Sequence, residues 1–127
     1  MGNGESPKRP HERLDVWQDA MALVETVYRL SRSFPAAERF GLTPQVRRCA
    51  VSVPSNIAEG AARRSTAEYL RFLSIARGSL SELATQMQIA VRLRYLEPAP
   101  HFAQQVDAVF ARLTALMNVL QKSEDAR

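Results

Sequence analysis

The chain has 127 residues, of which 46% are hydrophobic, so it is long enough for one domain with an apolar core. No apolar run reaches about 20 residues, the length that a membrane-spanning helix needs, and the polar N-terminal segment is unlike a secretory signal. The formal charge is +4, and 15 of the 17 basic residues are arginine, which favours an anionic partner. With Cys49 as the single cysteine, an intrachain disulfide is excluded, and we expect a cytoplasmic protein without a membrane partner.

The chain begins with a polar segment that leads into a first helix. Residues 1–13 are rich in glycine, proline and charged groups, so we expect a disordered N-terminal arm. Apolar residues then recur at helical spacing and predict a helix over 15–33, with Asp15 as its N-cap. Phe34 and Pro35 end this helix, and a loop follows.

A second helix is predicted over 44–62. Thr43 is a suitable N-cap, Pro44 suits the first helical position, and Gly60 lies near the end. The helix is apolar over much of its circumference, which is typical of a helix packed on more than one side. Pro54 lies inside it and weakens an isolated helix by about 3 kcal/mol, so tertiary contacts must offset that cost.

The third helix is predicted over 66–94 and is the longest. Ser65 and Glu68 have the spacing of a capping box at its start. Gly78 lies in its middle and costs about 1 kcal/mol of helix propensity, which favours a position where another helix approaches closely.

A fourth helix over 101–122 completes the fold. Residues 97–100 contain two prolines and break the chain before it, and residues 123–127 form a short charged tail that we expect to fray. Four amphipathic helices with short connections predict an all-α, antiparallel up-down-up-down four-helix bundle over residues 14–122. Because the apolar stripes are broader than one bundle core requires, we also expect self-association.

The arginines concentrate in the middle of the chain. Residues 39–94 contain nine arginines and three glutamates, so this segment has a formal charge of +6. In an antiparallel bundle, arginines near the junction of the second and third helices should cluster at one end, and the others should gather at the opposite end. The candidate nucleic-acid-binding residues are Arg47, Arg48, Arg63, Arg64, Arg71, Arg92 and Arg94.

Catalytic and metal-binding motifs are missing from the sequence. It has no glycine-rich nucleotide-binding motif, no HExxH and no paired cysteines. Neither His11 nor His101 follows a glutamate at the Glu-x-x-His spacing that di-iron bundles use. We therefore expect a protein that is not an enzyme and that needs no cofactor or metal.

One structural ion pair is predicted between the second and third helices. Glu59 and Arg77 each lie beside a glycine that would let the helix backbones approach. If buried, such a pair would cost about 3–5 kcal/mol when one partner is removed. The alternative is two solvated side chains whose interaction is worth under about 1 kcal/mol.

Four segments resemble the 23S rRNA intervening-sequence protein family: LDVW at 14–17, ERFGLTPQ at 38–45, RRCAVSVPSNIAEG at 47–60 and ARGSLSEL at 76–83. The resemblance covers roughly residues 14 to 120. These are small bacterial proteins whose name describes gene location rather than an established role. The resemblance implies a left-handed antiparallel four-helix bundle that assembles as a ring-like homopentamer.

The same bundle is similar in fold to the accessory variability determinant protein of diversity-generating retroelements. That protein is a basic pentamer that binds nucleic acid and a reverse transcriptase, but a shared fold does not by itself transfer function. Three hypotheses follow: an oligomer that binds RNA or DNA, an interaction scaffold for a partner such as a reverse transcriptase or a ribosomal component, and a purely structural oligomer.

Overall fold

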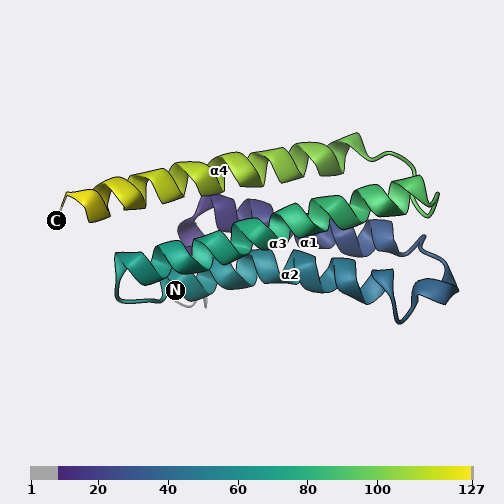
Figure 1. Ribbon diagram of the computed structural model, residues 1–127, viewed down its shortest axis with the longest axis horizontal. Coiled ribbons are helices and arrows are strands. Elements are labelled where there is room, and N and C mark those ends of the chain that lie inside the picture. Colours follow the sequence, from purple (N-terminus) through teal and green to yellow (C-terminus); the bar gives the residue numbers. More distant parts are fainter. Residues whose placement is uncertain (1–8, 127) are drawn as a thin grey trace, which may run out of the picture.

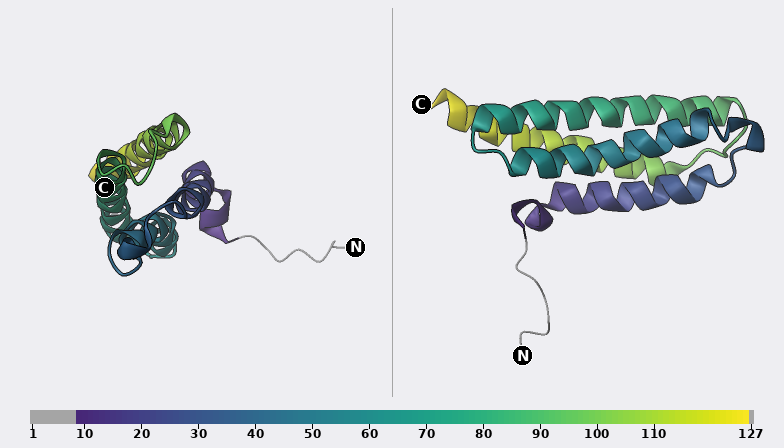
Figure 2. Two further views of the ribbon diagram at one scale, coloured as in Figure 1. Left: turned by 90° about the vertical axis from the view of Figure 1, so that its right-hand side faces the viewer. Right: turned by 90° about the horizontal axis from the view of Figure 1, so that it is seen from below.

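The computed structural model describes residues 9–126, which form four long α-helices and contain no strand. The helices are α1 (Asp15–Ser31), α2 (Leu42–Ala61), α3 (Thr66–Arg92) and α4 (Pro100–Asp125). Successive helices run in opposite directions, with α1 beside α2 and α4, and α3 beside α2 and α4 (Figures 1 and 2). The predicted all-α, antiparallel four-helix architecture is thus confirmed.

The core lies along the centre of the bundle and receives side chains from all four helices. It consists of the apolar stripes that the sequence predicted, and its most deeply buried large side chains are Leu23, Ile57, Leu73, Leu80, Leu83 and Leu113. Burial of a leucine or isoleucine contributes about 1.5–3 kcal/mol, so these stripes account for the association of the helices.

The most extensive helix contact joins α2 and α3, and small side chains make it close. The hydroxyl groups of Ser52 and Ser79 lie 2.8 Å apart across it. Gly60 is buried where the end of α2 meets the start of α3, and a Cβ placed on it would lie 3.0 Å from the Cβ of Phe72. Gly78 differs, because a Cβ there would meet no atom of residues 9–126 within 4 Å. The predicted close approach is therefore present at Gly60, whereas no described helix of the same chain approaches Gly78.

The N-terminal arm is partly structured. Residues 10–13 form a short 3-10 helix, and the ring of His11 packs edge-on against that of Trp17 with centroids 4.9 Å apart. The expectation of disorder is wrong for these residues, because an aromatic contact with α1 orders them. Residues 1–8 of the predicted arm lie outside the described part of the chain.

Several helix ends depart from the sequence expectation, and one cap agrees with it. α1 begins at Asp15, with Leu14 rather than Asp15 as its N-cap. α2 begins at Leu42, where the Glu38 side chain rather than Thr43 accepts from the first backbone amide. α4 continues to Asp125, so most of the predicted frayed tail is helical. Ser65 caps α3 as expected by accepting from the amide of Glu68 at 3.1 Å.

Candidate nucleic-acid interface

An open hollow of about 790 Å³ lies between α1, the loop after it and the first half of α2. Its lining contains no aspartate or glutamate. Among residues 9–126, no carboxylate forms an ion pair with any of its three arginines. It is lined by Tyr28, Arg39, Thr43, Pro44, Arg47, Arg48, Val51 and Ser52. The hollow therefore concentrates positive charge that the described residues leave uncompensated.

Arg47 is held in a fixed orientation within this hollow. Its Nε donates a 2.9 Å hydrogen bond to the hydroxyl of Ser31, and its guanidinium carbon lies 4.7 Å from the ring centroid of Tyr28. The Ser31 hydroxyl in turn donates to the carbonyl of Tyr28. Because only one of the five guanidinium N–H groups is used by Ser31, the others remain for a planar anion such as phosphate.

The loop between α1 and α2 is fastened by one carboxylate. Glu38 accepts from the backbone amide of Leu42 at 2.9 Å and from the hydroxyl of Tyr95 at 2.8 Å. These two hydrogen bonds, the amide first, lower the pKa of Glu38, and the bond to Glu38 raises the pKa of Tyr95. Ser33 donates to the Tyr95 carbonyl at 2.9 Å, and the ring of Phe34 lies 5.9 Å from that of Tyr95. The α1–α2 loop is thereby tied to the end of α3.

Arg39 and Phe40 lie at the outer turn of this fastened loop. The guanidinium carbon of Arg39 is 4.8 Å from the ring centroid of Phe40, while Arg39 also lines the hollow. Phe40 is 87% exposed, the largest exposed fraction among the large apolar side chains described.

The opposite end of the bundle brings together the other predicted arginines, but beside carboxylates. Arg63 and Arg71 both stack on Phe72, with guanidinium carbons 4.7 and 4.8 Å from the ring centroid. Arg63 pairs with Glu59 at 3.6 Å, and Arg71 pairs with Glu68 at 3.7 Å. Arg64 and Arg63 line a smaller hollow of about 380 Å³ that Glu68 also borders. The expected clustering is present, and glutamates offset much of its charge.

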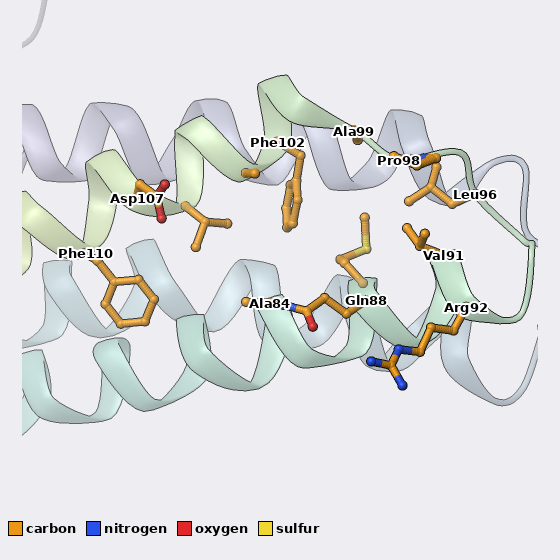
Figure 3. A pocket seen from close by; sticks show the side chains of 13 residues that line it. Ala84, Gln88, Val91, Arg92, Leu96, Pro98, Ala99, Phe102, Asp107 and Phe110 are labelled. Carbon is orange, nitrogen blue, oxygen red and sulfur yellow. The ribbon is translucent and has the colours of Figure 1, made fainter.

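Arg92 borders a third depression, of about 450 Å³, between α3 and α4. Figure 3 shows Phe102 and Phe110 pointing from α4 toward α3, with the Arg92 guanidinium at the edge. Arg94, exposed in the turn after α3, adopts a positive φ of 64°. Arg92 lies at the end of α3, at the same end of the bundle as the α1–α2 loop, as expected (Figure 1). It lines a hollow between α3 and α4, however, and not the one that contains Arg47 and Arg48.

Comparison with known families identifies the chain. The sequence model of the family described as 23S rRNA-intervening sequence protein matches residues 12–122. The chain belongs to this family. No match is found among curated proteins.

The predicted ion pair between Glu59 and Arg77 is absent among the described residues, where Glu59 has another partner. Glu59 and Arg77 are both exposed, and Glu59 pairs with Arg63 one helical turn away. Residues four apart on one helix are neighbours on its surface, so the pair forms without any particular alignment of two helices. The side chains of Glu59 and Arg63 are 54% and 39% exposed, so their interaction is worth under about 1 kcal/mol.

Two features of the candidate interface were not predicted from the sequence. Arg39 was counted in the charge of its segment but not among the candidates, because loop residues lack the periodicity that places helical side chains. Phe40 and Tyr28 were not considered as partners for arginine. The Arg39-Phe40 dipeptide next to Gly41 was the available signal.

The described residues also bear on three other kinds of site: a reactive cysteine, a metal centre and a membrane-spanning helix. Burial and a hydrogen bond to Glu82 raise the pKa of the Cys49 thiol to about 11, so it is protonated at neutral pH and is a poor nucleophile. In residues 9–126, no group of three or more histidine, cysteine or acidic side chains could hold a metal ion. No described helix is both long and apolar enough to cross a bilayer.

Proposed function

We propose that this protein binds nucleic acid, RNA or DNA, without catalysing a reaction, and does so as a homo-oligomer. The observation that carries the proposal is the hollow lined by Arg39, Arg47 and Arg48, in which no carboxylate of residues 9–126 pairs with the guanidinium groups. Arginine forms bidentate hydrogen bonds with phosphate, and Arg47 is already oriented by Ser31 and Tyr28. Phosphate contacts of this kind give affinity that depends on salt and little on sequence.

Self-association is supported by the outer face of α3. Ile75 and Ile89 are 41% and 43% exposed, and Gly78 lies between them along the helix with open space around it. A glycine in mid-helix costs about 1 kcal/mol relative to alanine, and no contact among the described residues accounts for it. We infer that a second copy of the chain approaches α3 there, and the family resemblance implies a ring-like homopentamer. Light scattering should give a mass well above the 14.2 kDa of one chain, and a monomer would refute this part.

An interaction scaffold is the alternative, and the same face of α3 favours it. If Ile75 and Ile89 contact a different protein, such as a reverse transcriptase or a ribosomal component, the arginines form contacts within that complex instead of binding nucleic acid directly. In that case the purified protein binds neither RNA nor DNA at low salt.

The test is a titration of labelled RNA and DNA oligonucleotides at several salt concentrations. Replacing Arg47 and Arg48 by alanine should weaken binding and reduce the slope of log affinity against log salt by about 0.7–0.9 for each phosphate that is no longer neutralised. The matched control replaces Arg63 and Arg64, which removes the same formal charge where Glu59 and Glu68 lie nearby. We expect a smaller effect there, and equal effects would refute the assignment to the α1–α2 hollow.

A further inference from the structure

Phe40 is exposed in a way that the fold does not require. Its side chain is 87% exposed, whereas the next most exposed large apolar residue, Val119, is 65% exposed. Phe40 is absent from the apolar cluster and from the partly buried residues packed against it. Its ring meets the guanidinium of Arg39 instead. The side chain therefore contributes little to folding, and its ring is available to a partner outside the chain.

The loop that carries Phe40 is rigid enough to present the ring. Its backbone makes consecutive turns, with the amide of Arg39 donating to the carbonyl of Ala36 and that of Gly41 donating to the carbonyl of Glu38. The Glu38 carboxylate fastens this turn to α2 and to Tyr95. An aromatic ring presented by an ordered loop loses little conformational entropy when a flat partner stacks on it.

Phe40 also lies next to the arginines that we propose bind phosphate. Arg39 stacks on Phe40 and lines the hollow that contains Arg47 and Arg48, so the ring stands beside the arginine cluster. A second aromatic-arginine stack, Tyr28 with Arg47, lies inside the hollow, and Tyr28 is 40% exposed. Alternating aromatic and cationic groups are the features with which proteins bind single strands, since bases stack on rings while phosphates meet arginine.

We propose that the α1–α2 end binds single-stranded nucleic acid, with an unpaired base stacked on Phe40 and neighbouring phosphates on Arg39, Arg47 and Arg48. This inference rests on the proposed function and specifies its substrate class. In a duplex the faces of each base are covered by its neighbours, so only an unstacked base offers Phe40 a partner. A duplex meets the arginines through its phosphates alone.

The test compares fluorescence anisotropy of a labelled single-stranded oligonucleotide, the duplex of the same length, and a single strand with abasic sites. The variants are Phe40→Ala, Phe40→Leu and Phe40→Tyr, which respectively remove the side chain, keep an apolar one and keep an aromatic ring. Circular dichroism and light scattering on each variant report folding and assembly.

We expect the wild type to prefer the single strand. Phe40→Ala and Phe40→Leu should each lose about fivefold or more in affinity for the single strand, while Phe40→Tyr stays near the wild type. Their salt slopes should match the wild type because the arginines that meet phosphate are unchanged. Affinity for the duplex and for the abasic strand should change little in any Phe40 variant.

Four results would overturn the inference. The first is that wild type and Phe40→Ala bind the single strand equally well, while the double substitution of Arg47 and Arg48 by alanine weakens binding. This result refutes stacking but leaves phosphate binding intact. A duplex bound as tightly as the single strand refutes the substrate class. A lower oligomer mass in Phe40→Ala assigns the ring to a protein contact. Absence of binding by the wild type refutes the proposed function itself.

Discussion

Replacing Gly60 by alanine tests the close contact between α2 and α3. A Cβ at this position would lie 3.0 Å from both the Cβ of Phe72 and the Cδ1 of Tyr69, and 3.2 Å from the carbonyl oxygen of Tyr69. Two of these three atoms are a backbone oxygen and a Cβ, which cannot swing away as the end of a flexible side chain can. The methyl group therefore forces the two helices apart.

The magnitude follows from two opposing effects. Overpacking a filled contact costs about 1–3 kcal/mol, and the rigid neighbours of Gly60 place it in the upper half of that range. Alanine regains up to about 1 kcal/mol of helix propensity, and less in the last turn of α2. The free energy of unfolding should fall by about 1–2 kcal/mol, which lowers the melting temperature by about 4 °C for each kcal/mol in a domain of this size.

Urea unfolding monitored by circular dichroism measures the change, with the m-value confirming that the same surface is exposed. The matched control is Gly78→Ala, where the added methyl meets no atom of residues 9–126 within 4 Å. Within one chain this substitution should raise the free energy of unfolding by up to about 1 kcal/mol. Because we infer that a second copy approaches α3 at Gly78, light scattering should first show that the variant assembles as the wild type does, and a lower mass would mean that the methyl group disturbs the contact between copies. A Gly60→Ala protein at least as stable as the wild type would refute the argument from close approach.

Three further predictions concern the ionisable groups. The pKa of Glu38 in the folded protein is lowered from 4.5, so the stability that its carboxylate contributes is complete above pH 4.5 and is lost as the pH falls through the pKa of the folded state. The difference in free energy of unfolding between wild type and Glu38→Gln should therefore shrink in acid and stay constant near neutrality. A difference that does not depend on pH would contradict this. Glu59→Gln should change the free energy of unfolding by under about 1 kcal/mol, as measured by urea unfolding, because the carboxylate is exposed and its ion pair with Arg63 is a solvated one. Cys49 should react with iodoacetamide more slowly than a free thiol at pH 8, because burial and Glu82 raise its pKa to about 11. A rate equal to that of free cysteine would show that the thiol is neither buried nor held by Glu82.

Most of the fold could be predicted because the sequence carries local signals for it. The apolar stripes placed the four helices, and the Ser65 cap was correct because capping depends on neighbouring positions in the chain. The start of α2 was not predictable in the same way. There Glu38 reaches the amide of Leu42 from a 3-10 turn, and Tyr95, far along the chain, holds the same carboxylate in place.

The interface was predictable only in part, because side-chain pairing across helices depends on their rotation and register. The sequence indicated that arginines would gather at both ends of the bundle, and it correctly joined Arg63 to Arg71. It placed Arg47 and Arg92 at the same end of the bundle, but it could not show that they line different hollows there. It also paired Glu59 with Arg77 across helices when a partner lay within one helical turn.

The placement of carboxylates, rather than the number of arginines, separates the two ends of the molecule. At the α2–α3 turn, Glu59 and Glu68 each hold an arginine, so an incoming phosphate must compete with a carboxylate already in place. At the α1–α2 end the nearest loop carboxylate, Glu38, is engaged by Leu42 and Tyr95 and stays out of the arginine hollow. An anion entering that hollow meets guanidinium groups with free donors. In a cyclic oligomer this end would recur on every subunit, so one strand could contact several hollows, and its affinity would depend on assembly as well as on salt.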